Sequence, residues 1–208
     1  PEKSWNYEVG AHLSTPSHKV QADLALFYID CRDQQLTVFP EGQVTGRLMT
    51  NAGRTRSFGG EASLLATLWR NLDLQVAYGY TRATFVKFDT GKADYAGNFI
   101  PYAPQHTLYA GASYTLRTGW NWLEYVIFRV AANGAGRIYW NEANTFSQPF
   151  YALLEASIRF EHRHWAVDVW GRNLTDTRYD TFYFMSIGNW FLQRGRPRTF
   201  GVSLSITL

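Results

Sequence analysis

Arg198-Thr-Phe-Gly-Val-Ser-Leu-Ser-Ile-Thr-Leu208, the last stretch of the chain, decides the fold. From Phe200 onward every second residue is apolar and lies on one face of an extended strand, and the glycine, serine and threonine residues between them lie on the other. The ends of soluble domains usually fray, whereas this alternation continues to Leu208. We therefore expect a terminal strand that is paired along its whole length. Such pairing is needed inside a membrane, where no water is present to form hydrogen bonds with the backbone.

The same two-residue period recurs along the whole chain, and no stretch shows the periodicity of a helix. The pattern predicts an all-β protein with nine strands. The predicted strands are residues 5–13, 20–28, 58–68, 72–80, 108–116, 122–132, 152–160, 165–169 and 200–208.

The connections between these strands alternate between short and long. The short turns are residues 15–19, 70–71, 117–121 and 161–164, and the long, irregular segments are residues 32–53, 86–105, 133–149 and 173–197. Tight turns therefore lie at one end of the sheet and long loops at the other. Bacterial outer-membrane barrels have short periplasmic turns and long extracellular loops, so this sorting predicts a transmembrane, antiparallel, up-and-down β-barrel whose last strand ends on the periplasmic side.

The two faces of the strands support a membrane barrel over a soluble sheet with one wet face. Residues 54–69 and 72–85 form runs longer than typical soluble strands. Aromatic residues on the apolar face gather near both ends of the strands, as in the interfacial belts of membrane barrels. The predicted belts are Phe58, Tyr78, Tyr80 and Phe200 near the long loops, and Tyr114, Trp122, Phe160 and Trp165 near the short turns. The opposite, polar face would line a hydrated lumen or contact a plug.

Composition excludes several other classes of protein. Among the 208 residues 17% are aromatic and only 18% charged, and the formal net charge of +3 from scattered basic residues gives no indication of nucleic-acid binding. A mean hydropathy of −0.28 and the lack of a long apolar run predict no transmembrane helix. The single cysteine, Cys31, excludes an internal disulfide. No phosphate-binding loop or nucleophile motif is present, and we expect no cofactor and no enzyme activity.

Nine strands cannot close an antiparallel barrel, which needs an even number. The opening residues resemble mid-chain sequence rather than a signal peptide. We therefore expect residues 1–208 to be the C-terminal part of a larger barrel whose earlier strands precede this chain.

Several stretches resemble the C-terminal barrel of TonB-dependent outer-membrane receptors in their order and spacing. They are Trp5-Asn-Tyr-Glu-Val-Gly10, Ala25-Leu-Phe-Tyr-Ile-Asp-Cys-Arg-Asp33, Asn51-Ala-Gly-Arg-Thr-Arg-Ser-Phe-Gly-Gly-Glu61, Tyr78-Gly-Tyr-Thr81, Ile100-Pro-Tyr-Ala-Pro-Gln-His-Thr107, Gly171-Arg-Asn-Leu-Thr-Asp-Thr-Arg-Tyr179 and Gly195-Arg-Pro-Arg-Thr-Phe-Gly201. The chain departs from the family at Leu208, where most members end in phenylalanine.

The resemblance implies a 22-stranded barrel with an N-terminal plug domain, a class whose lumen is plugged. Such receptors bind a scarce nutrient, most often a ferric siderophore, with their extracellular loops, and import it with energy from the TonB complex. Contact with TonB would be made by an N-terminal region absent from this chain. The resemblance further implies a place in the lipid bilayer of the outer membrane and recognition by the barrel-assembly machinery. A haem or cobalamin receptor of the same family, or a passive porin-type channel, remains an alternative.

Arginine and aromatic residues in the long loops are candidate ligand contacts, because many ferric siderophores are anionic and aromatic. The alternative is that they only pack the loops together. The candidates are Tyr95, Tyr102, Arg137, Tyr139, Trp140, Tyr183, Trp190 and Arg194. A structural role is expected instead for Asn173, Asp176, Tyr179, Phe200 and Leu208.

Other chemical signals are weaker. His162 and His164 could bind a metal ion, but two ligands in a turn are too few, and we expect a polar turn. Glu155 and Asp168 could form a hydrolytic pair, but arginines on the same face favour a lumenal charge network. An outer-membrane enzyme would need a nucleophile–base pair at the outer rim, where His106 stands without a partner in the sequence.

Overall fold

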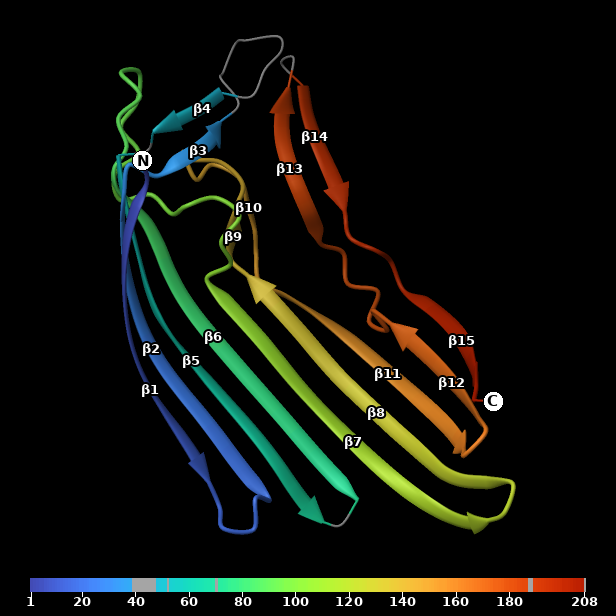
Figure 1. Cartoon of the computed structure of the whole chain (residues 1–208). Helices are drawn as coiled ribbons and strands as arrows, with labels where there is room; N and C mark the ends of the chain where they lie inside the picture. The colour runs from blue at the N-terminus through green and yellow to red at the C-terminus, as the bar shows by residue number, and fades with distance from the viewer. Residues whose placement is uncertain (39–47, 52, 70, 187–188, 208) are drawn as a thin grey trace.

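Nine antiparallel strands form a single curved sheet (Figure 1), which confirms the all-β prediction. The computed structural model describes residues 1–38, 48–51, 53–69, 71–186 and 189–207. In spatial order the strands are β1 (Lys3–Ser14), β2 (Val20–Arg32), β5 (Arg54–Trp69), β6 (Leu72–Lys87), β7 (His106–Trp120), β8 (Leu123–Gly136), β11 (Tyr151–His162), β12 (Trp165–Arg172) and β15 (Thr199–Ile206). Among the described residues no helix is long and apolar enough to cross a membrane.

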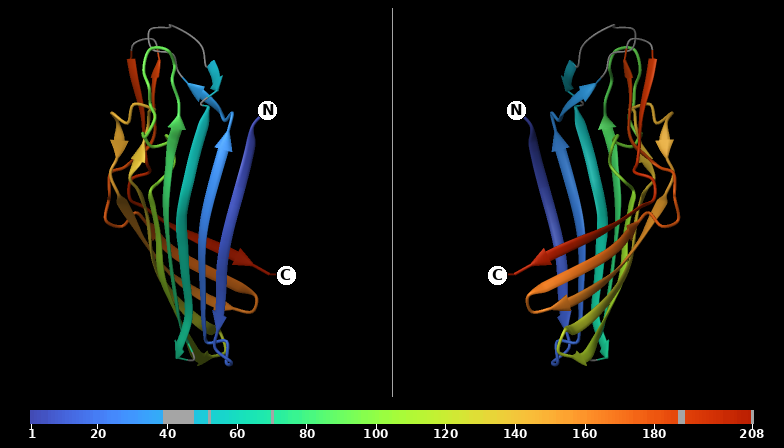
Figure 2. Two further views of the ribbon diagram at one scale, coloured as in Figure 1. Left: turned by 90° about the vertical axis from the view of Figure 1, so that its left-hand side faces the viewer. Right: turned by 90° about the vertical axis from the view of Figure 1, so that its right-hand side faces the viewer.

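The sheet bends into an open trough rather than a closed barrel (Figure 2). Strands β1 and β15 form its two edges, and within the described residues neither pairs with the other. The tight turns gather at one end of the trough and the long connections at the other (Figure 1). This arrangement is the one predicted from the alternation of short and long connections.

Most strands extend beyond their apolar cores toward the long loops. Strands β5 (Arg54–Trp69) and β6 (Leu72–Lys87) span the long runs predicted at residues 54–69 and 72–85, whereas β2 and β8 continue past their predicted ends to Arg32 and Gly136. A tilted strand needs about ten residues to span the bilayer, so these additional residues reach into water. The terminal strand is described from Thr199 to Ile206, and Leu208 lies outside the described residues.

The short turn between β7 and β8 is present but is shorter than the predicted residues 117–121, because β7 continues to Trp120 and β8 begins at Leu123. The pairing shifts register between Arg117 and Trp120, and Gly119 has a φ of 76°. A glycine with positive φ lets a strand pass through a bulge and resume pairing. The alternation breaks at this bulge, which is why the sequence pattern indicated a turn there.

Three of the four long segments, predicted to be irregular, contain two-stranded ribbons instead. They are β3 (Gln35–Val38) with β4 (Leu48–Asn51), β9 (Ile138–Tyr139) with β10 (Ser147–Gln148), and β13 (Asp180–Ser186) with β14 (Asn189–Arg194). The last ribbon has aromatic side chains at successive positions, as in residues 182–184, so it lacks the alternation that identifies strands with one buried face.

The pairing register places the predicted apolar and polar sets on opposite faces. Tyr28 pairs with Phe58 on the convex outer face, and Asp23 pairs with Ser63 on the concave inner face. The outer apolar side chains stay exposed, with 67% of Val9 and 65% of Leu204 accessible. An apolar face of this extent is expected of a surface that contacts lipid.

The predicted aromatic belts lie on this outer face. Phe58, Tyr78 and Phe200 are exposed toward the long loops, and Tyr114 and Trp122 toward the short turns. The bilayer core therefore corresponds to the apolar side chains between the two belts.

Candidate ligand-binding site

Three long connections join into one structure at the open end of the trough, where they would face the outside of the cell. The backbone N–H of Gln105 donates to the carbonyl of Arg137 at 3.0 Å. The side chain of Asn144 binds both backbone polar groups of Phe99. Its Oδ1 accepts from the Phe99 N–H at 2.7 Å, and its Nδ2 donates to the Phe99 carbonyl at 2.9 Å. These bonds fix the segment between β6 and β7 to the segment between β8 and β11.

Tyr102 connects all three segments. Its N–H donates to the Tyr139 carbonyl at 2.8 Å, and its hydroxyl donates to the Tyr183 carbonyl at 2.9 Å. Its ring packs at 5.5 Å from Trp140 and at 5.6 Å from Phe182. The φ of Tyr102 is +64°, a region that bulky residues rarely adopt. These contacts on four sides stabilise that conformation.

A second group of rings lies beside Tyr102. Phe146 packs against Tyr183 and Trp190, with centroids at 4.9 and 4.6 Å, and those two rings stack at 5.2 Å. Burial disfavours the ionised phenol and raises the pKa of Tyr183. Half of Trp190 remains exposed. Trp190, on β14, thus gives this group of rings a solvent-accessible surface.

One buried side chain joins the base of this ribbon to β10. Gln148 is 7% exposed, its Oε1 accepts from the Asp180 N–H at 2.9 Å, and its Nε2 donates to the Pro149 carbonyl at 3.0 Å. A buried polar group with both ends satisfied favours one arrangement of its neighbours over others.

The last long loop begins and ends in a tight polar knot. Asn173 is 5% exposed, its Nδ2 donates to the carbonyls of Thr177 and Arg196, each at 3.0 Å, and its Oδ1 accepts from the Thr177 N–H at 2.9 Å. Asp176 accepts from the Arg198 N–H at 3.0 Å. The two ends of the loop are therefore joined before the ribbon begins.

Tyr179 lies just beyond this knot. Its ring stacks on Tyr151 at 4.5 Å and occupies the space where a side chain of Gly195 would be. Phe200, on the outer face of β15, is 69% exposed.

The candidate ligand contacts divide by accessibility. Tyr102 is 44% and Trp190 50% exposed. Arg194 is exposed on the same loop as Trp190, and Arg137 is exposed on the segment between β8 and β11. Trp140 is only 8% exposed. The half-buried residues are Tyr95, Tyr139 and Tyr183, of which Tyr95 packs against the buried pair Phe85 and Phe88.

Sequence reasoning did not identify three phenylalanines of the aromatic group, Phe99, Phe146 and Phe182. The density of aromatic residues in 182–191 was the one available signal for the last of them. It could not show that Phe99 and Phe146 come to the same place from other loops.

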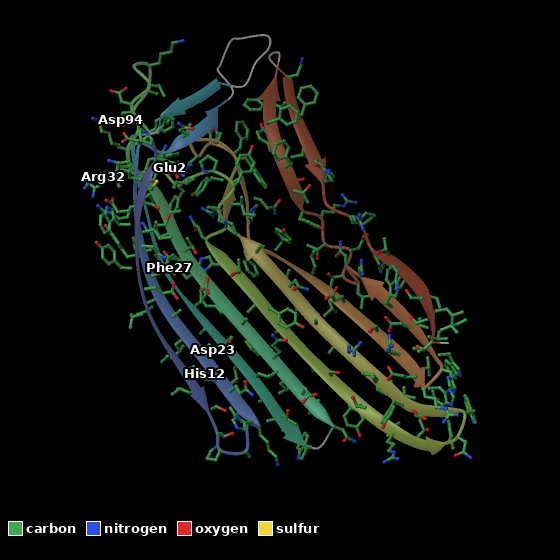
Figure 3. All side chains as sticks on the ribbon, viewed as in Figure 1. Glu2, His12, Asp23, Phe27, Arg32 and Asp94 are labelled. Atoms are coloured by element: carbon green, nitrogen blue, oxygen red, sulfur yellow. The ribbon has the colours of Figure 1, made fainter. Side chains whose placement is uncertain are left out.

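Two of the hollows that the described residues form lie on the inner face below the loops, with volumes of about 470 and 680 Å³. Glu155 and Asp168 line the smaller one together with Arg129 and Arg172. Asn133 Nδ2 donates to Glu155 Oε1 at 3.2 Å, and Asp168 Oδ1 is buried with no hydrogen-bond partner among the described residues. The lumenal charge network therefore stays a prediction. His12 and Asp23 line the larger one, on the concave side, whereas Arg32 points away from the trough on the convex side (Figure 3).

No group of three or more potential metal ligands occurs in the described part of the chain. The rings of His162 and His164 lie 5.6 Å apart at a short turn. Cys31 is buried at the upper end of β2.

A family model described as the β-barrel of TonB-dependent receptor-like proteins matches residues 1–174. The chain belongs to this family. The predicted family, the outer-membrane location and the barrel fold are therefore confirmed. TonB-dependent receptors are receptors and transporters rather than enzymes.

Curated relatives among the TonB-dependent receptors include the pesticin receptors of Yersinia. The protein from Yersinia pestis is 28% identical over 211 residues, which cover 99% of this chain and 29% of the relative. The one from Yersinia enterocolitica is 29% identical over the same shares. The chain thus spans less than a third of the curated relatives it matches.

Solved structures of receptors agree in fold. The ferric yersiniabactin uptake receptor FyuA of Yersinia pestis superposes with a TM-score of 0.82 at 25% identity, over 99% of this chain and 30% of that one. The ferric citrate transporter FecA gives a TM-score of 0.75 at 22% identity, over 99% and 32%.

Proposed function

We propose that residues 1–208 form the C-terminal part of the barrel of an outer-membrane receptor that imports a ferric siderophore by energy-coupled transport. The observation that carries this proposal is the joined set of loops, which exposes aromatic rings and arginines at the outer mouth of the trough. The similarity to a protein described as a ferric yersiniabactin uptake receptor supports an iron complex as the class of ligand.

The chemistry of the exposed side chains suits such a ligand. Trp190 and Tyr102 offer ring faces for stacking, and Arg137 and Arg194 offer cations for carboxylate or phenolate oxygens. Trp140 and Tyr95 would act indirectly, by supporting the rings that make contact. A haem or cobalamin ligand remains the alternative within the family.

The open trough supports a larger assembly. Further strands would pair with its two free edges and complete a barrel of 22 strands in total. Its hydrated inner face would contact a plug domain. The TonB complex would act through a region N-terminal to this chain, and the barrel-assembly machinery would insert the whole barrel. We assign no catalytic step to the chain, because its acidic inner-face pair shares its hollow with two arginines.

Equilibrium binding of a panel of radiolabelled ferric siderophores to the full-length protein that contains this chain tests the proposal. We expect one member to bind, and we expect Trp190→Ala together with Arg137→Gln to raise its Kd about tenfold or more, since each such contact contributes on the order of 1 kcal/mol. Trp122→Ala, at the opposite end of the sheet, is the matched control and should leave the Kd unchanged.

Uptake in cells separates a receptor from a passive channel. Import of the bound siderophore should cease in cells that lack TonB, while surface binding persists. Binding of haem or cobalamin with no binding of any iron siderophore would overturn the ligand assignment, and TonB-independent uptake would favour a porin.

A further inference from the structure

Basic side chains form a compact group on the outer, lipid-facing side of the sheet near the long loops. We call this group the outer basic cluster. It comprises Lys3, Arg32, Arg54, Arg56 and Arg82, from β1, β2, β5 and β6. Lys3, Arg32 and Arg54 form one row across β1, β2 and β5. Arg56 lies in the next outward row, and Arg82 pairs with Phe58 in the row after that. Asp30, opposite Arg56, is the one acidic residue on the outward rows of these four described strands.

The cluster lies at the depth of lipid headgroups. The pair of Tyr28 and Phe58 belongs to the upper aromatic belt, and the pair of Asp30 and Arg56 is the next outward pair above it. Successive outward pairs are about 7 Å apart along a strand, since each residue advances about 3.4 Å. Arg82 pairs with Phe58 at the level of the belt itself. The other members of the cluster begin about 7 Å above the belt, where the interfacial region of a bilayer lies.

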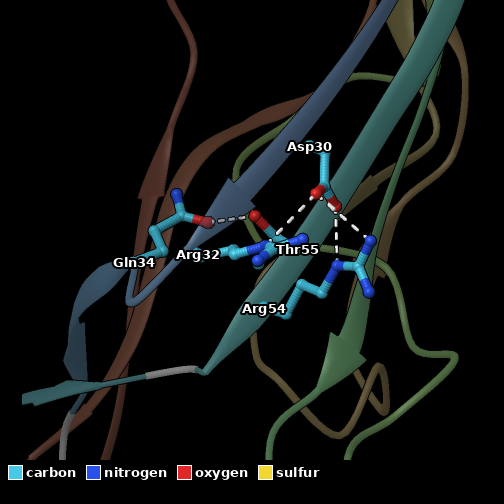
Figure 4. A network of polar contacts seen from close by, with 5 residues as sticks. All are labelled: Asp30, Arg32, Gln34, Arg54 and Thr55. Carbon is cyan, nitrogen blue, oxygen red and sulfur yellow. Dashed lines mark hydrogen bonds and ion pairs between the residues drawn. The ribbon is translucent and has the colours of Figure 1, made fainter. Parts of the chain in front are cut away.

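Asp30 fixes the arginines in a defined arrangement (Figure 4). Arg54 binds it through two hydrogen bonds, Nε to Oδ1 at 2.7 Å and Nη2 to Oδ2 at 3.1 Å, and Arg32 Nε lies 3.6 Å from Oδ2. The Asp30 side chain is 11% exposed, whereas Arg54 is 39% and Arg32 63% exposed. The carboxylate thus reduces repulsion between the guanidinium groups and leaves their outer N–H groups accessible.

Arg56 extends the cluster toward the bilayer. Its guanidinium carbon lies 6.0 Å from the centre of the Tyr28 ring. Its Nε is buried and makes no hydrogen bond to any described residue. The buried Nε is out of reach of a lipid, so any contact with an external anion would be made by the N–H groups that a guanidinium carries on Nη1 and Nη2.

We propose that the outer basic cluster binds the phosphate groups of a phosphorylated glycolipid, lipopolysaccharide, in the outer leaflet around the barrel. Arginine forks match the geometry of phosphate oxygens. The cations exceed the acidic groups, so the cluster attracts anions. It continues the apolar outer face, so a lipid whose acyl chains lie against Leu24, Leu26 and Leu64 would carry its headgroup to the arginines. The inference requires only the orientation of the barrel and is independent of the imported ligand.

The test compares charge changes at the two ends of the sheet in the full-length protein. Arg32→Gln with Arg56→Gln removes two cations and preserves the bidentate pair of Arg54 and Asp30, so the fold is retained. Arg117→Gln with Arg163→Gln removes the same charge at the short-turn end and serves as the control. Both variants are purified in a nonionic detergent and titrated with lipopolysaccharide that carries both phosphates on its lipid portion, with bound lipid counted by native mass spectrometry.

A basic residue near an anionic surface contributes about a fivefold preference, so we expect about 25-fold weaker binding in the Arg32 and Arg56 variant and no change in the control. The lipid with its phosphates removed should bind both proteins equally weakly. Equal binding of the two variants, or undiminished binding of the dephosphorylated lipid, would overturn the proposal. Complete competition by millimolar inorganic phosphate would also overturn it, because it would indicate an ion site rather than a lipid site.

Discussion

Asn173 is suited to its place because an amide can donate and accept at the same time. Its Nδ2 donates to two carbonyls and its Oδ1 accepts one N–H, while its φ of 48° lies in a region that asparagine tolerates better than most residues. The side chain therefore stabilises both the turn after β12 and the return of the chain to β15.

Asn173→Asp keeps the shape of the side chain, yet we expect this substitution to destabilise the closed ends of the last loop. The new carboxylate oxygen would face the carbonyls of Thr177 and Arg196 with no proton to donate, a loss of about 2–4 kcal/mol. Hydrogen exchange of residues 174–186 in the full-length protein should accelerate at least tenfold. Thr175→Ala, which removes an exposed hydroxyl and its 2.8 Å hydrogen bond to the Thr177 hydroxyl but leaves the Asn173 bonds in place, is the control. Equal exchange in both variants would show that Asn173 carries no such role.

Gly195→Ala tests the contact between Tyr179 and the backbone of the returning strand. A methyl group at this position would lie 2.0 Å from the Tyr179 ring, so the ring must move at a cost of about 1–3 kcal/mol. Thermal unfolding in detergent should show the loss. In a Tyr179→Ala background the same substitution should cost much less, and a cost that persists there would locate the strain elsewhere.

Strand β6 allows its two faces to be compared with adjacent residues. Val76 points outward between the aromatic belts and Ala77 lines the larger inner hollow. Val76→Arg should reduce the free energy of unfolding by about 2–4 kcal/mol, because it places a charge in lipid. Ala77→Arg should cost less than about 1 kcal/mol. Guanidine unfolding in lipid vesicles measures both, and the reverse order would mean that the assignment of the faces is inverted.

An element could be predicted from sequence where its two faces meet different environments. Strands of the main sheet have one face in lipid and one in water, so alternation identified all nine of them. The ribbon of β13 and β14 is aromatic on both faces and was missed for that reason. The loop site was predictable only as a set of residue types. Tyr95 looks the same in sequence as Tyr102, yet one packs against Phe88 and the other joins three loops.

At the scale of the molecule, the two free edges predict that residues 1–208 need further strands. Each unpaired backbone group on β1 or β15 would cost several kcal/mol in hydrocarbon. Produced alone and added to vesicles, the chain should yield no folded, protease-resistant species, whereas the full-length protein should. A stable folded species from the isolated chain, at a mass of several copies, would indicate that copies of the chain pair edge to edge instead.

The bonds that join the three outer loops have a consequence for how such receptors diversify. Tyr102 binds two other loops through its backbone and its hydroxyl. A single loop transplanted from a relative with another ligand would therefore lack the residues on the other two loops that it normally contacts. Chimeras that exchange residues 86–105, 137–149 and 173–197 together should keep both stability and the donor's ligand preference. The three loops would then behave as one heritable module, and a change of nutrient would require coordinated replacement rather than the drift of a single segment.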